Sequence, residues 1–212
     1  YVNYSPKEWL VIQEKFLDGR VGTMIQLYAD SLGVTVGSLK DLGIGQTGEV
    51  FTFPMFEENG LNISGIQKRS ITGEKWCYRG SRLGLFFPYT VYSEKDIYRL
   101  YITEGATDCA CAIDLGLPAI GRANCNSCKN EICFIVDNWR TTKDLHEIII
   151  IPDRDIAGED GAKELQECIE DYFYGAIRVR LLYPPGGKDL REAMNNNPNR
   201  VIELVQKIQK GY

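Results

Sequence analysis

The chain has 212 residues, of which 44% are hydrophobic and 25% charged, and this composition is that of an ordinary globular protein with one large or two small domains. Its net charge of −5 at pH 7 excludes a protein that coats nucleic acid by bulk positive charge, but it leaves room for a local basic patch. No apolar run is long enough to span a membrane, so we expect no membrane association. The chain begins at Tyr1 and not at Met, so we expect a fragment or a processed chain.

The cysteines indicate a reducing compartment. Their number is seven, and an odd count without a secretion signal is typical of free thiols. The pair Cys125-x-x-Cys128, with Cys133 nearby, has the spacing of metal ligands. A structural zinc site needs four ligands, and the missing ones would have to come from Cys109 and Cys111 on a neighbouring helix. We therefore do not expect zinc.

The first 48 residues predict a small helical region. A helix is expected over 6–17, with Ser5 as its N-cap, Pro6 at its first position and Glu8 completing a capping box. A second amphipathic helix is expected over 22–32, and a short helical turn over 38–42. This region ends in the Gly-rich segment GIGQTG and carries no functional motif.

From Glu49 the hydrophobic period changes to two, which predicts an antiparallel meander over 49–87. Its first two strands, EVFTFPMFE and LNISGIQKR, are separated by Asn59-Gly60, a strong hairpin signal. Further strands are expected at 75–79 and 83–87, and we assign 49–95 to this β subdomain.

This meander is basic although the chain is acidic. The segment from Leu61 to Thr90 has a net charge of +4, which leaves −9 on the rest of the chain. Its aromatic residues are Trp76, Tyr78, Phe86 and Phe87, and its basic residues are Lys68, Arg69, Lys75, Arg79 and Arg82. Such a surface can bind a phosphate backbone or single-stranded bases. Equally, basic residues protect edge strands from aggregation and aromatic residues fill cores, so both interpretations stay open.

After a linker at 88–97, strands and helices alternate. Strands are expected at 98–103, 118–121, 148–151 and 177–182, and helices at 107–116, 130–140, 159–173 and 199–210. This alternation predicts a parallel sheet with right-handed crossovers and helices on its faces.

The most informative stretch is IIIIPDRDIAG, at 148–158. Four isoleucines in a row indicate a strand that is buried on both faces. Asp153 and Asp155 then stand at its carboxyl end, where open α/β sheets bind their ligands. Two neighbouring carboxylates favour a hard divalent cation, Mg²⁺ or Mn²⁺. The alternative is a surface turn, because Asp and Gly are common turn formers.

Two further acids follow other strands of the same predicted sheet. Glu104 ends the first strand, and Lys188-Asp189 follow the fourth. Because parallel strands place their carboxyl ends at one edge, about four acidic groups are expected to converge there. Such a cluster suits one or two Mg²⁺ ions that bind phosphate oxygens.

Three motifs carry a family resemblance. EGATD at 104–108, DRDIAG at 153–158 and GGKDLREA at 186–193 resemble the signatures of the Toprim domain, which occurs in DnaG-type primases, phage primase-helicases, topoisomerases, some nucleases and recombination mediators. The match is most like the primase branch, because GKD and the preceding FPMFEENGLNISGIQKR…GEKW…GLFF are similar to primase catalytic cores. The resemblance implies a Toprim fold, Rossmann-like with a parallel sheet flanked by helices, over 96–195. The small helical region and the basic antiparallel β subdomain would precede it, and a C-terminal helix would occupy 196–212.

The resemblance also implies roles for individual residues. Glu104 would be the family's invariant acid, acting as general base or metal partner, and Asp108 the second acid of its motif. Asp153 and Asp155 would be metal ligands, and Asp189 an accessory acid. The expected contacts to template or nucleotide are Lys68, Arg69, Lys75, Arg79, Arg82, Arg154 and Lys188.

Arg154 departs from the family pattern, because primases often have a small residue between the two aspartates. It would either contact a nucleotide phosphate or mark a branch with altered activity. The N-terminal zinc-binding module usual in such primases is absent from this sequence, and so is a P-loop.

The resemblance predicts a primase core that makes RNA primers on a single-stranded DNA template from ribonucleoside triphosphates. It implies Mg²⁺ or Mn²⁺ as cofactor, a replicative helicase as partner and the cytoplasm of a bacterial or phage-infected cell as location. One alternative is a Toprim nuclease whose acids activate water. Another is a non-catalytic DNA-binding module similar to recombination mediators.

Overall fold

The computed structural model describes residues 3–210. Within this range, nine strands form one sheet in the order β4-β3-β2-β5-β7-β6-β8-β9, and β1 pairs with β2 beside this path. The strands from β1 to β5 pair antiparallel, whereas β7, β6, β8 and β9 are parallel neighbours. The strands are β1 Gly45–Thr47, β2 Val50–Phe56, β3 Ile63–Ser70, β4 Lys75–Cys77, β5 Leu85–Phe86, β6 Arg99–Glu104, β7 Ala119–Arg122, β8 Glu147–Ile151 and β9 Arg178–Leu181.

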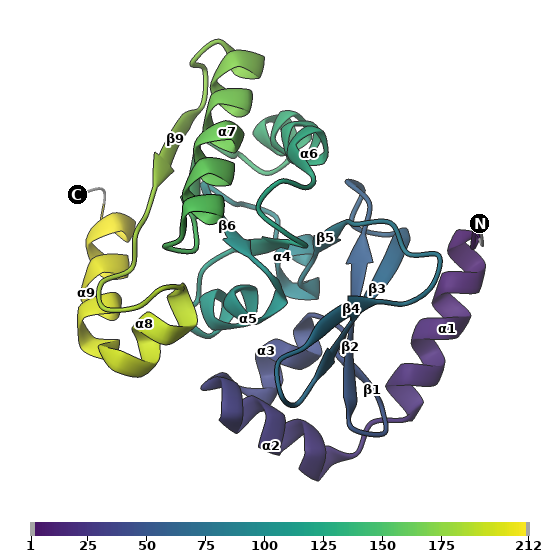
Figure 1. The fold of residues 1–212 in the computed structure, drawn as a ribbon. Helices are drawn as coiled ribbons and strands as arrows, with labels where there is room; N and C mark the ends of the chain where they lie inside the picture. Colours follow the sequence, from purple (N-terminus) through teal and green to yellow (C-terminus); the bar gives the residue numbers. More distant parts are fainter. Residues whose placement is uncertain (1–2, 211–212) are drawn as a thin grey trace.

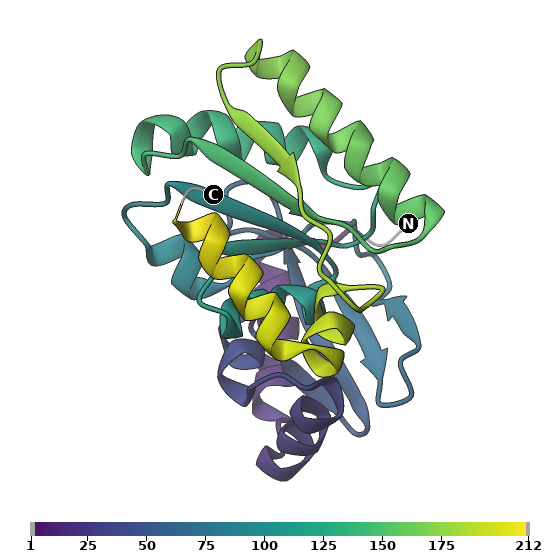
Figure 2. The same cartoon turned by 90° about the vertical axis from the view of Figure 1, so that its left-hand side faces the viewer.

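Helices cover both faces of the sheet. In Figure 1, α1 lies along the antiparallel half, α6 and α7 lie together on one side of the parallel half, and α5, α8 and α9 lie on the other. Figure 2 shows α8 and α9 from the side, in front of the sheet. The helices are α1 Pro6–Asp18, α2 Gly22–Leu32, α3 Val36–Asp41, α4 Tyr89–Ser93, α5 Ala106–Asp114, α6 Lys129–Thr142, α7 Ile156–Phe173, α8 Leu190–Asn196 and α9 Pro198–Gln209. None of these helices is long and apolar enough to cross a membrane.

Strand β8 packs into the hydrophobic core on both faces of the parallel half. Ile149 and Ile151 pack into the core under α2, α3, α5, α8 and α9, whereas Ile148 and Ile150 pack into the core under α6 and α7. The continuous isoleucine run therefore fills both faces at once, as a central parallel strand requires. The expected fold class is confirmed: a mainly parallel α/β sheet flanked by helices, preceded by a small helical and antiparallel β subdomain.

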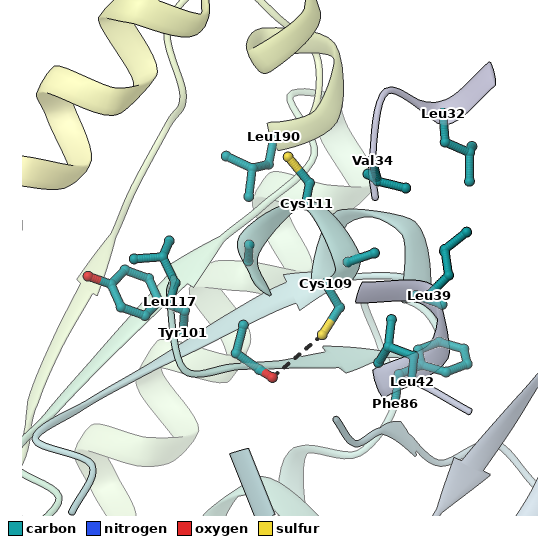
Figure 3. Packing of buried hydrophobic residues seen from close by; sticks show 14 of the residues in the cluster. Leu32, Val34, Leu39, Leu42, Phe86, Tyr101, Cys109, Cys111, Leu117 and Leu190 are labelled. Carbon is teal, nitrogen blue, oxygen red and sulfur yellow. Dashed lines mark hydrogen bonds between the residues drawn. The ribbon is translucent and has the colours of Figure 1, made fainter. Parts of the chain in front are cut away.

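Helix α5 packs against β6, β7 and α8. Figure 3 shows Cys109 and Cys111 on opposite sides of this helix, with Cys111 directed toward Leu190 of α8. The Cys109 thiol donates a hydrogen bond to the Ala119 carbonyl at 3.5 Å, and burial raises the pKa of Cys111 to about 12. Both thiols are neutral core groups, and neither points into the loop that holds Cys125.

Three local expectations were wrong. The fourth meander strand does not lie beside β4. Instead, β5 pairs with β2 and β7, so that it joins the antiparallel and parallel halves. The Gly-rich segment contains β1, and the linker contains α4, whose Val91 is buried. These elements are short and are held by tertiary packing, which local sequence patterns do not reveal.

The hairpin at Asn59-Gly60 is confirmed, but its loop is longer than two residues. The loop spans 57–62, and the Asn59 side-chain oxygen accepts hydrogen bonds from the backbone N–H groups of Leu61 and Asn62 at 2.8 and 2.9 Å. Gly60 adopts φ +66°, a left-handed conformation that glycine tolerates. Because one sheet runs through both halves, the proposed domain boundaries stay a prediction.

Candidate active site

The carboxyl edge of the parallel strands carries the expected acids. Glu104 is the last residue of β6, and Asp153 follows the end of the adjacent strand β8. Asp155 is the N-cap of α7, and Asp189 is the N-cap of α8. The structure therefore brings these four acids to one edge of the sheet.

Burial and neighbouring negative charge act on the pKa values of these acids. The pKa of Asp153 rises to about 6, first because of burial and then because of the negative charges of Glu104 and Asp189. Burial raises the pKa of Glu104 as well, and the charge of Arg122 opposes that rise. Crowded carboxylates of this kind resist ionisation unless a cation joins them.

Asp108 lies deeper, on the first turn of α5. It is 6% exposed, and its side chain accepts a hydrogen bond from the Arg191 backbone N–H at 3.0 Å. Burial, followed by the charge of Asp189, raises the pKa of Asp108 to about 7. Asp108 thus ties α5 to α8 beneath the acidic edge.

Asp155 differs from Asp153 because it already has partners. Its Oδ1 accepts a hydrogen bond from the Gly158 backbone at 2.9 Å, and its Oδ2 lies 2.8 Å from the Lys188 ammonium. The hydrogen bond from Lys188, followed by that from Gly158, lowers the pKa of Asp155. Lys188 therefore lies at the predicted edge, but as the counter-ion of an acid.

The donor set fits a hard divalent cation. All of the edge acids offer carboxylate oxygens, and Oε2 of Glu104 is buried without a hydrogen-bond partner. Among residues 3–210, no group of three or more His, Cys, Asp or Glu side chains is arranged so that it could hold a metal ion. Mg²⁺ commonly uses only one or two protein carboxylates and takes its other ligands from water and substrate phosphates. The acids at this edge offer carboxylates of the type that such a site uses.

The antiparallel half presents two of the expected basic residues to this edge. Arg69 of β3 donates a hydrogen bond from Nη1 to the Thr107 hydroxyl at 2.9 Å, and Lys75 is its cross-strand partner. Partial removal of the Lys75 ammonium from water, followed by the charge of Arg69, lowers the pKa of Lys75. The negative charges of Asp153, Asp108 and Glu104 raise it and oppose that shift. These two cations therefore face the acids across the junction of the two halves.

The other basic residues lie elsewhere. The Lys68 ammonium lies 4.7 Å from the ring centre of Tyr78 and 5.6 Å from that of Phe16, on the side covered by α1. Arg82 pairs with Glu57 at 2.6 Å, and Arg79 is exposed. Because successive side chains of a strand point to opposite faces, the basic stretch does not form one continuous surface.

The aromatic residues of this stretch are also divided. Phe86 and Phe87 are buried in the core, whereas Trp76 is 41% exposed.

Arg154 does not point at the acids. Its backbone N–H donates to the Lys188 carbonyl at 2.6 Å, and its guanidinium lies 5.9 Å from the Tyr183 ring centre. A second hydrogen bond, from Nη2 to the Tyr183 carbonyl, measures 3.5 Å. Arg154 thus links the loop after β8 to the loop after β9.

The cysteines considered for zinc lie in separate places. Cys125 packs on α7 at Gly161, where an added Cβ would come within 2.7 Å of the Cys125 Cβ. Cys133 instead lies beside Cys168, with 3.7 Å between the sulfur atoms. Gly161 and Cys168 are two helical turns apart on α7, about 10 Å along the axis. Cys125 and Cys133 are therefore not directed to a common point.

Three residues of the site escaped the sequence analysis: Arg122, Thr107 and Arg191. Arg122 ends β7 and is the register partner of Glu104. The strand was predicted to end one residue earlier, at Gly121, so the charged residue was not placed at the acidic edge. The signal available in the sequence was the charged residue Arg122 directly after the apolar run of this strand.

No protein-family model matches the chain, and no curated protein matches it in sequence. Solved structures do match it in fold. The primase fragment of the bacteriophage T7 primase-helicase has 18% identity and a TM-score of 0.61, covering 84% of this chain and 72% of that one. A DnaG primase catalytic domain bound to single-stranded DNA has 15% identity and a TM-score of 0.70, covering 96% and 79%.

The Escherichia coli primase catalytic core has 15% identity and a TM-score of 0.66, covering 95% of this chain and 82% of that one. At such low identity, the similarity is evidence of a shared fold. The chain therefore has the fold of DnaG-type and phage primase catalytic cores.

Proposed function

We propose that this chain is a primase catalytic core, or part of one, which synthesises short RNA primers on single-stranded DNA. The observation that carries the proposal is the acidic edge formed by Glu104, Asp153, Asp155 and Asp189 within a fold shared with primase cores. Basic residues from the antiparallel half face this edge, as a polyanionic template and a triphosphate require.

Asp153 is the first choice of metal ligand. Its pKa is raised by burial and by neighbouring carboxylates, so that a cation would relieve an unfavourable charge. Asp155 already pairs with Lys188, and it would join the site if Lys188 turned toward a phosphate instead. Bound Mg²⁺ or Mn²⁺ would neutralise the charge of the triphosphate and polarise its α-phosphate.

The reaction joins the 3′-hydroxyl of one nucleotide to the α-phosphate of the next. The new P–O bond forms as the bond to pyrophosphate breaks, and the hydroxyl proton must leave. We assign the acceptance of that proton to Glu104, because it is the acid that ends β6 at this edge and its Oε2 has no hydrogen-bond partner. Arg69 and Lys75 would position the nucleic-acid backbone, and Lys188 a nucleotide phosphate.

The supporting comparisons suggest the partners. Similar structures include a primase domain bound to single-stranded DNA and the primase fragment of a primase-helicase. We extend these to a single-stranded template, ribonucleoside triphosphates and a replicative helicase for this chain, acting in the cytoplasm of a bacterial or phage-infected cell.

The test is primer synthesis by the purified chain with labelled single-stranded DNA, four ribonucleotides and Mn²⁺. We expect short ribonucleotide products that fall at least about 100-fold with Asp153→Asn. Asp171→Asn is the matched control, because Asp171 is an exposed residue at the far end of α7. Shortened DNA in place of RNA products would replace the primase proposal with a nuclease.

A further inference from the structure

A fully buried cation stands at the acidic edge and has no part in the reaction as outlined. Arg122 is the last residue of β7 and is only 1% exposed. Its side chain is among the largest that are fully buried within residues 3–210. An arginine stays protonated in proteins, so its charge remains even when the side chain is buried. Burying such a charge is costly unless an anion or several acceptors compensate it.

The hydrogen bonds of Arg122 compensate it only in part. Its Nη1 donates to the Cys125 carbonyl at 2.5 Å, which attaches it to the loop between β7 and α6. Its Nε is buried without a hydrogen-bond partner. One neutral carbonyl does not balance a full positive charge, so an anion nearby must contribute.

Glu104 is that anion. It is the register partner of Arg122 in the parallel pair of β6 and β7, and register partners on adjacent strands direct their side chains to the same face. Its Oε2 is also buried and without a hydrogen-bond partner, so the two side chains act on each other by charge and do not form a direct ion pair. The Gly105 backbone N–H donates to the Arg122 carbonyl at 2.8 Å, which fixes the two strand ends against each other.

The other charges near Glu104 are less constrained. Lys75 is exposed on β4 and reaches the edge from the other half of the molecule, while Asp153 and Asp155 are like charges. Arg122 is the cation at this position that packing holds in place, because its side chain is enclosed by the sheet and by the Cys125 loop.

We propose that Arg122 is a positioning residue for Glu104: the charge of its buried guanidinium attracts the Glu104 carboxylate at the acidic edge, and its hydrogen bond to the Cys125 carbonyl couples that charge to the Cys125 loop. The inference rests on the proposed function for its catalytic consequence only. The coupling between the two side chains is a property of the folded chain and can be measured without activity.

The first test is a double-mutant cycle on thermal unfolding in metal-free buffer, with Arg122→Met, Glu104→Gln and the double variant. We expect Arg122→Met to lower the unfolding midpoint by at least about 5 °C in the wild-type background. In the Glu104→Gln background, Arg122→Met should lower the unfolding midpoint by less than half as much, because no carboxylate is left without its cation. Equal losses in both backgrounds, including failure of both variants to fold, would overturn the pairing.

Arg99→Met is the matched control for this cycle. Arg99 begins the strand that Glu104 ends, and its own partner is Glu147. We expect its cost to be the same in both backgrounds.

The second test separates positioning from binding in the primer assay. Arg122→Gln should lower kcat by about 10- to 100-fold while nucleotide KM and single-stranded DNA affinity change less than about twofold. Arg122→Lys should restore part of the rate because it keeps a cation. Equal impairment of the two variants, or a loss confined to KM or DNA affinity, would contradict a positioning role.

The two proposals fail in different ways. A wild-type chain that makes no primers, even on a pre-annealed primer, would overturn the proposed function. The unfolding cycle would still decide whether Arg122 and Glu104 are coupled.

Discussion

The acids at the two ends of the parallel strands differ in how far neighbouring cations compensate their charge. At the amino end, the Glu147 side chain is 3% exposed and is surrounded by three arginines. Arg99 and Arg178 are its register partners on either side, and Arg180 lies 2.8 Å away. Arg99 also donates to the Gln209 carbonyl at 3.1 Å, which ties the end of α9 to the sheet.

At the carboxyl end the compensation is incomplete: Lys188 pairs with Asp155, but among residues 3–210 neither Asp153 nor Glu104 has an ion pair. Burial and mutual repulsion raise the pKa of Asp153 to about 6, and burial with the charge of Asp189 raises that of Asp108 to about 7. A cluster that cations compensate contributes to the fold, whereas a cluster left short of cations is poised to bind one. Strongly perturbed carboxylates at a sheet edge are typical of functional sites.

Glu147→Gln should produce the largest loss of stability. It would leave three arginines around a neutral side chain, and removing one partner of a buried ion cluster costs about 3–5 kcal/mol. Urea unfolding measures this change. Arg178→Met is the control, because the Arg178 side chain is 67% exposed and its loss should cost less than about 1 kcal/mol. If both variants lose the same amount, Glu147 is not the centre of the cluster.

Gly158→Ala tests how closely α7 approaches the acidic edge. An added Cβ would lie 2.5 Å from the Asp153 carbonyl oxygen and 3.0 Å from the Asp153 Cβ. We expect a loss of about 1–3 kcal/mol and a weaker response to Mn²⁺, because Asp153 must move. At Gly22 an added Cβ meets nothing within 4 Å, so Gly22→Ala should be neutral. If Gly158→Ala leaves the free energy of unfolding unchanged, the loop that carries Asp153 can move aside without cost.

The same contrast explains what the sequence could reveal. The isoleucine run of β8 predicted its own burial, and the order of strands then predicted that Glu104, Asp153 and Asp189 share an edge. Local motifs and a simple topological rule were enough, because each acid directly follows its strand or begins its helix.

The parts that escaped prediction depend on long-range pairing. Strand β5 consists of two residues, and its place between β2 and β7 is visible only in three dimensions. Arg122 faces Glu104 because β7 pairs with β6, and no local pattern encodes that neighbour. The basic residues were found, but strand alternation places Lys68 and Arg69 on opposite faces.

Asp153→Asn should have a small stabilising effect in metal-free buffer, about 0.5–1 kcal/mol near pH 8, because it removes a crowded charge. The folded-state pKa of Asp153, about 6, lies above its usual value, so ionisation opposes folding above pH 6. Wild type should therefore gain stability relative to the variant as the pH falls through 6 toward 4.

Mg²⁺ should reverse this order near pH 8. A cation that binds the folded wild type stabilises it by mass action, and Asp153→Asn should lose most of that gain. Thermal unfolding with EDTA or with Mg²⁺ measures both effects. A variant that is less stable than wild type in EDTA would show that the Asp153 charge is already compensated.

Lys188→Met should have the smallest effect. The Lys188 and Asp155 side chains are 53% and 45% exposed, and an ion pair so open to solvent contributes about 0.5 kcal/mol or less at low salt. Lys188 lowers the pKa of Asp155, so this contribution is present above the unfolded-state pKa and is lost as the pH falls through the lower folded-state value. Urea unfolding at pH 7, at low and high salt, tests it. A loss as large as that of Glu147→Gln would mean that the carboxyl end is compensated like the amino end, and the contrast between the two ends would fail.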